Sequence, residues 1–256
     1  MIAIALDHRL DRTLVIGAPP SAVFRYFTDP VRWAAWWGKG STIDGRPGGR
    51  VFIRYPEGTE VLGEVIEIDA PHRIVFSYGY ASGAPVAPGG SRVTIRLEAV
   101  PRGTRLHLVH EFAEASVRDE HVQGWRYQLS LFANVVANEV HGDTAARADA
   151  WFAMWSDTDD ASRAAALAAL AAPAISMRDR FSAIDGIDDL TRHIAAAHKF
   201  MPGLRLQRDG NARHCQGTLI ADWVAVGADG QPRGRGTNVF TLGPDGKVET
   251  VTGFWS

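Results

Sequence analysis

The feature that most constrains this chain is a series of five strand-like segments between residues 50 and 112. Each segment is short and is bounded by glycine, proline or aspartate turn residues. Strands joined by short turns pair antiparallel. The sequence therefore predicts an antiparallel sheet with strands over 50–55, 60–68, 73–80, 91–100 and 104–112.

Helices are predicted on both sides of this series. Before it, a strand over 13–16 leads to a helix that opens at Pro19 and Pro20, and Asp29-Pro30 starts a second helix over 31–38. After it, apolar residues recur at helical spacing between residue 118 and about residue 140. We expect this long helix to lie on the sheet, through Val122, Trp125, Leu129, Phe132 and Val136.

A second domain is predicted after the break at Gly142. Asp143 or Thr144 can cap a new helix, and an alanine-rich helix over 161–172 follows and ends at Pro173. A strand over 175–181, a helix from 187 to about 201 and four more strands complete the half: 204–209, 213–226, 234–242 and 247–255. The predicted class is α+β in two domains, 1–141 and 144–256, both with curved antiparallel sheets.

Composition excludes several functions. The formal net charge is −2 without a basic cluster, so nucleic acid is not an expected partner. The single cysteine, Cys215, excludes an internal disulfide and a thiolate zinc site, and we predict no metal and no cofactor. The apolar run Ile2–Leu6 is too short for a signal peptide or a membrane span, so we expect a cytoplasmic protein without a membrane partner.

The first half resembles a known family. Its characteristic segments occur in order: SAVFRYFTDP (21–30), WW (36–37), RPGG (46–49), GEVIEIDAPHRIVFSY (63–78) and GWRYQLSLFANVV (124–136). They resemble the activator of heat-shock protein 90 ATPase homologue-like family, which belongs to the START/Bet v-like (SRPBCC) superfamily. The resemblance implies a helix-grip fold, in which a sheet wraps around one long helix and leaves a cavity.

Four residues of the first half are candidate ligand contacts: Trp33, Trp37, His110 and Trp125. Alternation along 106–112 places His110 on one face with Leu106, Leu108 and Phe112, so we expect it to point inward. Two interpretations stay open for His110, namely ligand contact and a histidine that a neighbouring hydroxyl satisfies. Trp33, Trp36 and Trp37 are either core residues or a stacking surface at the cavity entrance.

In the second half, alternation over 175–181 places Asp179 on one face with Ile175, Met177 and Phe181. If this face lines a pocket, desolvation raises the pKa of the Asp179 carboxyl and makes it a general base. The alternative is a charged Asp179 paired with Arg178, Arg180 or another arginine, in a purely structural role.

Residues 144–255 resemble the nuclear transport factor 2-like superfamily, in its SnoaL-like and ketosteroid isomerase-like branch, through WFAMW (151–155), ISMRDRFSAIDG (175–186) and GTNVFTLGPDGKVETVTGFW (236–255). The resemblance implies a cone-shaped domain with a deep apolar pocket. It implies Asp179 as general base, Asn238 in place of an oxyanion-hole aspartate and Trp151 in place of a tyrosine donor, as in the known pKa tuning of ketosteroid isomerase. These replacements put steroid isomerisation itself in doubt, and Asn238 is equally interpreted as a buried amide that holds the sheet.

Further residues of the second half complete the prediction. Met177 and Phe240 are expected ligand contacts in the pocket. His193 and His198 lie on the predicted helix whose apolar stripe is Leu190, Ile194, Ala197 and Met201, and we expect both histidines at the solvent edge of that helix.

Three functions follow from these observations. The first is a protein that binds a small hydrophobic molecule, with two cavity domains and no complete catalytic set. The second is an isomerase, cyclase or dehydratase that uses Asp179 as general base. The third is a cochaperone-like role for the first half, and a homodimer is possible through the open sheet face of the second half.

Overall fold

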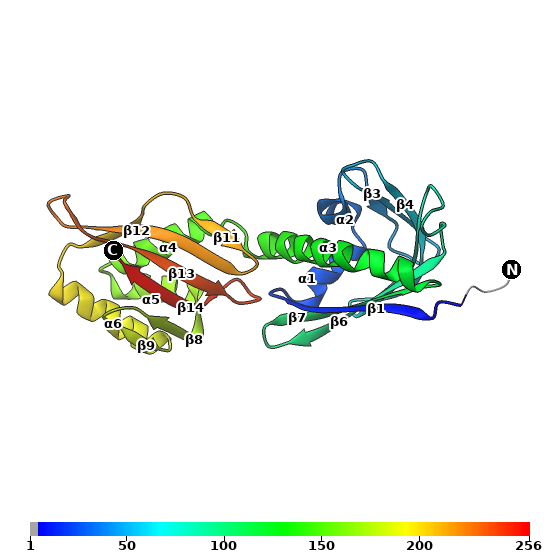
Figure 1. The fold of residues 1–256 in the computed structure, drawn as a ribbon. Helices are drawn as coiled ribbons and strands as arrows, with labels where there is room; N and C mark the ends of the chain where they lie inside the picture. The colour runs from blue at the N-terminus through cyan, green and yellow to red at the C-terminus, as the bar shows by residue number, and fades with distance from the viewer. Residues whose placement is uncertain (1–4) are drawn as a thin grey trace. The chain divides into compact units, whose positions relative to one another are not determined.

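The structure, a computed structural model, describes residues 5–256. The residues before position 5 in the apolar run Ile2–Leu6 lie outside the described part. The contacts within the chain divide it into two compact units, Met1–Ala137 and Asn138–Ser256. The chain is a mixed α and β protein with two largely antiparallel sheets, one in each unit (Figure 1).

The first unit contains a seven-stranded antiparallel sheet in the order β1-β7-β6-β5-β4-β3-β2. Its strands are β1 (His8–Ile16), β2 (Thr42–Ile43), β3 (Arg50–Arg54), β4 (Glu60–Asp69), β5 (Arg73–Tyr80), β6 (Ser91–Val100) and β7 (Gly103–Phe112). The five central strands agree with the predicted segments to within a residue or so at each end. The two-residue β2 was not predicted, because its signal is too short for an alternation to appear.

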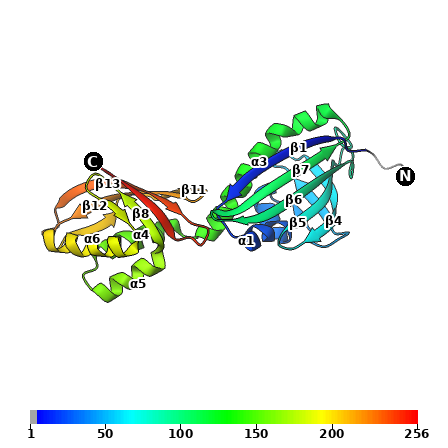
Figure 2. The same ribbon diagram turned by 90° about the horizontal axis from the view of Figure 1, so that it is seen from below.

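Three helices and a 3-10 turn complete this unit: α1 (Pro20–Phe24), η1 (Arg25–Phe27), α2 (Pro30–Trp37) and α3 (Ala115–His141). Asp29 caps α2, since its carboxylate accepts the backbone N–H groups of Val31 and Arg32 at 2.8 and 3.1 Å. The long helix α3 carries the predicted apolar stripe, and Figure 2 shows it running beside strands β1, β7 and β6. Its Trp125 contacts the sheet, because the indole N–H donates to His110 of β7 at 2.9 Å.

The second unit contains the end of α3, then α4 (Thr144–Ser156), α5 (Asp160–Leu170) and α6 (Ile187–Phe200). Its strands are β8 (Ala171–Arg178), β9 (Ala183–Asp185), β10 (Arg205–Arg208), β11 (Arg213–Cys215), β12 (Thr218–Val226), β13 (Pro232–Leu242) and β14 (Val248–Trp255). Asp143 is the N-cap of α4 and accepts the N–H of Ala146 at 3.0 Å, which confirms one of the two predicted caps. The sheet order is β10-β12-β13-β14-β8-β9, and β11 pairs with β12.

The expectation of a purely antiparallel sheet was wrong for one pair of strands in this unit. Strand β8 runs parallel to β14. The two strands are separated in sequence by α6 and strands β9 to β13, and a connection of this length permits parallel pairing. The remaining neighbours in the sheet are antiparallel.

Three boundaries in the second unit differ from the predictions. The alanine-rich helix ends at Leu170, and Pro173 lies inside β8 rather than ending the helix. The strand predicted over 213–226 is divided by a turn at residues 216–217 into β11 and β12. The strand predicted over 175–181 ends at Arg178, where the chain turns into the unpredicted β9.

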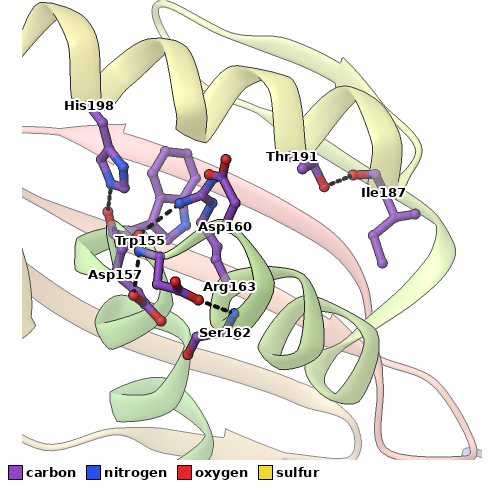
Figure 3. Close-up of polar contacts among 9 residues, drawn as sticks. Trp155, Asp157, Asp160, Ser162, Arg163, Ile187, Thr191 and His198 are labelled. Carbon is purple, nitrogen blue, oxygen red and sulfur yellow. Dashed lines mark hydrogen bonds and ion pairs between the residues drawn. The ribbon is translucent and has the colours of Figure 1, made fainter.

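The helices of the second unit are fastened to one another by polar contacts of buried groups (Figure 3). Arg163 of α5 is 2% exposed, and its guanidinium donates to the carbonyl of Asp157 at 2.9 Å and pairs with Asp160. His198 of α6 donates from Nε2 to the carbonyl of Trp155 at the end of α4, at 2.9 Å. The His198 bond holds the end of α4 against α6, and the Arg163 contacts fix the start of α5 to the segment that follows α4.

Candidate ligand-binding cavity

A cavity of about 530 Å³ lies in the second unit, between the sheet and the helices α4 and α6. Most of its wall is apolar, and three tryptophans contribute to it from α4, β12 and β14. Phe181 and Phe200 in the wall are 67% and 83% exposed, so the cavity reaches the surface at their end. The lining residues are Trp155, Asp179, Phe181, Ser182, His193, Ala196, Ala197, His198, Phe200, Met201, Leu204, Leu206, Trp223, Ala225 and Trp255.

Asp179 lies in this wall, as the sequence suggested, but not on a strand. It begins the turn after β8, where its backbone N–H donates to the carbonyl of Ser182 at 3.0 Å. Its Oδ1 accepts the backbone N–H of Phe181 at 2.7 Å. Because of this turn, the alternation expected for 175–181 does not extend to Phe181. The Phe181 side chain is exposed at the end of the cavity wall, beside Trp255, with ring centroids 5.2 Å apart.

The predicted alternative of an ion pair for Asp179 has no counterpart in residues 5–256. Arg178 pairs with Asp185 at 2.7 Å, and no arginine in the described chain forms a salt bridge with Asp179. The second carboxylate oxygen, Oδ2, has no hydrogen bond within the described residues. This oxygen is therefore available to a bound molecule.

Asn238 of β13, the predicted oxyanion donor, is 6% exposed and is not part of the cavity wall. Its Oδ1 accepts the indole N–H of Trp223 at 3.0 Å, which fixes the orientation of the amide. The indole reaches Asn238 because it lies over Gly236, where a Cβ atom would approach the ring to 2.5 Å. The amide therefore holds a wall residue of the cavity in place.

Gly253 of β14 brings Asp179 and Asn238 together. A Cβ atom on Gly253 would lie 3.0 Å from the Cβ of Asp179 and 3.3 Å from Oδ1 of Asn238. Both side chains thus pack against the same backbone position, which pairs with Asn238 in the sheet. The two groups that the sequence placed 59 residues apart lie on either side of one glycine.

The variant Gly253→Ala is expected to lower the free energy of unfolding by about 1–3 kcal/mol, because the added methyl group overpacks this contact. Urea denaturation measures the change. Gly124→Ala provides the contrast: a Cβ there meets nothing within 4 Å, and inside α3 the change should raise the free energy of unfolding by about 0.5–1 kcal/mol. A Gly253→Ala protein as stable as the wild type would contradict the close packing of Asp179 against β14.

The expected positions of His193 and His198 were wrong, because both line the cavity. His193 Nε2 lies 3.1 Å from Ser182 Oγ, and its ring packs edge-on against Trp155 with centroids 5.9 Å apart. His198 is fixed by its bond to the Trp155 carbonyl. Helix α6 therefore contributes to the cavity wall both residues of its apolar stripe and the two histidines at the edge of that stripe.

Trp151, Met177 and Phe240 were predicted as pocket residues, and the structure places them in the packed core instead. They are 1%, 5% and 1% exposed, and none is part of the cavity wall. Trp151 packs edge-on against Phe240 with centroids 5.5 Å apart, and its indole nitrogen has no hydrogen-bond partner within the described residues. The three side chains point into the interior of the unit, as expected, but they lie in its packed core and do not reach the cavity wall.

The candidate contacts of the first unit also form a packed core. Trp33 and Trp37 are 0% and 3% exposed, and Trp125 is 4% exposed. Trp33 donates to the carbonyl of Phe52 at 3.1 Å, and the rings of Trp37 and Trp125 meet with centroids 5.6 Å apart. Aromatic side chains thus pack against one another between α2, α3 and the sheet.

His110 is completely buried in this core, with both ring nitrogens satisfied. Ser91 donates its hydroxyl hydrogen to the carbonyl of Tyr78 at 2.8 Å, so its oxygen accepts from His110 Nε2 at 2.9 Å. Trp125 donates to Nδ1. These partners require the neutral ring with hydrogen on Nε2, and burial, with a smaller contribution from His121, holds the pKa of His110 well below its ordinary value.

Neither a membrane-spanning helix nor a metal-binding group stands out in residues 5–256. No helix there is long and apolar enough to cross a membrane. The same residues contain no group of three histidine, cysteine, aspartate or glutamate side chains placed to hold a metal ion.

Comparison with known proteins supports one of the two resemblances. Residues 17–137 match the family described as Activator of Hsp90 ATPase homolog 1-like protein. This match confirms the resemblance of the first half and covers somewhat less than half of the chain. No curated protein matches the chain.

Solved structures match about half of the chain. A protein of the SnoaL-like family from Agrobacterium tumefaciens is 23% identical, with 43% of this chain and 95% of that chain covered and a TM-score of 0.42. Protein Ms6760 from Mycobacterium smegmatis is 27% identical, with 52% of this chain and 91% of that chain covered and a TM-score of 0.42.

Proposed function

We propose that the second unit binds a small, largely apolar molecule in the cavity between its sheet and α6. The observation that carries this proposal is the cavity itself, with a volume of about 530 Å³ and a wall of tryptophan, phenylalanine and aliphatic side chains. Ligand sites in proteins are typically concave, mostly apolar and about 300–1,000 Å³ in volume. The cavity has these properties.

The wall also explains what would drive binding. Each Å² of apolar surface removed from water contributes about 25 cal/mol, and a fused-ring molecule would cover the faces of Trp155, Trp223 and Trp255. The exposed rings of Phe181 and Phe200 would lose contact with water as well. An apolar ligand therefore gains more from this site than a charged one.

The variant Ala196→Phe tests the proposal by filling the cavity. Ala196 of α6 lines the cavity, whereas its neighbour Ala195 is similarly half-buried but does not. We expect Ala196→Phe to weaken the binding of tetralin, a fused-ring hydrocarbon, at least about tenfold, which corresponds to 1.4 kcal/mol. Ala195→Phe should leave the affinity within about twofold of wild type.

Displacement of the fluorescent dye 1-anilinonaphthalene-8-sulfonate measures both affinities. Equal weakening in the two variants would show that the bound molecule is not in the cavity. Absence of tetralin binding to the wild-type protein would contradict the proposed function directly.

A second candidate function is proton transfer, and Asp179 favours it. Its free Oδ2 lies in an apolar wall beside the fixed amide of Asn238. A carboxylate held next to a bound ketone can remove a proton from the carbon beside the carbonyl, and the electron pair then moves to the carbonyl oxygen. Under this proposal the cavity binds an enolisable ketone and Asp179 is its general base.

The homodimer through the open sheet face also stays a proposal. Light scattering of the whole chain tests it, with twice the monomer mass of 27.8 kDa as the expected result.

A further inference from the structure

We propose that Ser182 and His193 form a second polar position in the cavity wall, which donates a hydrogen bond to an oxygen atom of the ligand. The cavity would then select apolar molecules that carry a hydrogen-bond acceptor, such as ketones, over plain hydrocarbons. This inference rests on the proposed ligand-binding function and adds the chemical class of the ligand.

The two residues come from different elements and meet only in the cavity. Ser182 ends the turn that begins at Asp179, and His193 lies in the middle of α6. Their side chains are 3.1 Å apart between Oγ and Nε2, and both lie in the wall of the same cavity. The turn therefore places Asp179 and the Ser182–His193 pair at the same region of the wall.

Counting hydrogen atoms shows that this pair has a donor to spare. A serine hydroxyl has one donor and a neutral imidazole has one donor, and the bond between them uses only one of these. If His193 donates from Nε2, the hydroxyl hydrogen of Ser182 is left; if Ser182 donates, the hydrogen on Nδ1 of His193 is left. Neither Ser182 Oγ nor His193 Nδ1 has another hydrogen-bond partner within residues 5–256.

Several other polar groups of the wall are less suited to supply this donor. His198 uses its Nε2 hydrogen on the carbonyl of Trp155, as Figure 3 shows. Asp179 is an acceptor when ionised. The indole nitrogen of Trp155 is buried, and that of Trp223 donates to Asn238. The indole of Trp255 lies at the exposed end of the wall, so Ser182 and His193 are the donors next to Asp179.

A cycle of ligands and variants tests the inference. The ligands are 2-tetralone and tetralin, which share a fused-ring skeleton and differ in one carbonyl oxygen. The variants are Ser182→Ala, His193→Phe and the double variant that combines them, and the measured quantity is the ratio of the tetralin Kd to the 2-tetralone Kd, from displacement of 1-anilinonaphthalene-8-sulfonate. We expect this ratio to fall about tenfold in the double variant, as loss of one buried hydrogen bond predicts. Each single variant should change the ratio less, because the remaining residue keeps one donor.

Thr191→Val provides the matched control. Thr191 lies on the same helix, outside the cavity wall, and its hydroxyl donates to the carbonyl of Ile187 at 2.8 Å. The control should leave both the ratio and the tetralin affinity at their wild-type values.

Three outcomes would overturn the inference. An unchanged ratio in the double variant Ser182→Ala/His193→Phe would show that the pair does not contact the carbonyl. Equal weakening of both ligands would show that the pair only fastens the turn to α6. If neither ligand binds the wild-type protein, the proposed function itself fails and this inference fails with it.

Discussion

Replacement of Asp179 by asparagine is expected to slow the exchange of ketone protons with solvent at least about 100-fold, the lower range for loss of a general base. The probe is 2-tetralone in D₂O, whose protons on the carbon between the ring and the carbonyl exchange through the enolate. Asparagine keeps the size of the side chain and its bond to the Phe181 N–H, but it cannot accept the proton. NMR integration of the ketone signal gives the rate above that of the buffer.

Binding of the ketone separates catalysis from affinity in this experiment. Asp179→Asn should bind 2-tetralone within about threefold of wild type, a difference well under 1.4 kcal/mol. Asp188→Asn is the control, because Asp188 is an exposed carboxylate of α6 outside the cavity. Exchange that continues at the wild-type rate in Asp179→Asn would assign that carboxylate to the turn alone.

Acidification from pH 7.5 to pH 5.0 is expected to destabilise the first unit by about 2 kcal/mol through His110 alone. In the folded chain the pKa of this imidazole is well below its ordinary value of 6.5, mainly because the ring is buried. In the unfolded chain the ring takes up a proton as the pH falls below about 6.5. The unfolded state therefore binds more protons, and stability that is fully present above pH 6.5 is lost as the pH falls.

His121 adds to this effect in the same direction. Burial lowers its pKa as well, partly opposed by the bond from its Nδ1 to the carbonyl of Val117 at 2.7 Å. Its Nε2 lies 3.1 Å from the hydroxyl of Tyr80. The pKa values of both histidines of this buried cluster thus lie below those of histidines in the unfolded chain.

The variant His110→Gln isolates the contribution of His110, because glutamine does not titrate. Urea denaturation followed by the Trp125 indole signal should show about 2 kcal/mol less loss of stability between pH 7.5 and pH 5.0 than in wild type. His72→Gln is the control, since His72 is exposed and should leave the loss unchanged. The same pH dependence in His110→Gln and wild type would contradict the neutral buried ring.

The elements of the first unit were predictable because local signals agree with the fold there. Turns rich in glycine and proline bound each strand, and the stripe from Val122 to Val136 on α3 matches the face that packs on the sheet. The sequence could not show whether the tryptophans leave a cavity. That depends on how Trp33, Trp37 and Trp125 pack in three dimensions, and their rings are buried against one another.

In the second unit the sequence identified Asp179 but assigned it to the wrong element. Its side chain bonds the N–H of Phe181, and this local bond competes with continued pairing of the strand. An aspartate two residues after the last apolar strand position was the available signal for such a turn. The strand therefore ends at Arg178, and alternation does not extend to Phe181.

His193 and His198 were not predicted as cavity residues. The helical pattern shows which residues of α6 are apolar, but it does not show how wide a face of the helix borders the cavity. Ser182 is eleven residues before His193 in the sequence, and the turn after β8 brings its side chain into contact with His193. A retrospective signal is that His193 and Ala197 are four residues apart on one helix face. Polar residues at the edge of an apolar stripe are thus candidates for a cavity wall.

NMR of the tryptophan indole N–H groups tests the central claim most directly. The chain has eight tryptophans, and three of them, Trp155, Trp223 and Trp255, line the cavity. Titration with 2-tetralone should shift these three indole signals and leave those of Trp33, Trp36, Trp37 and Trp125 in place, with Trp→Phe variants providing the assignments. Shifts confined to the tryptophans of the first unit, or no shifts at the solubility limit of the ketone, would contradict a ligand site in this cavity.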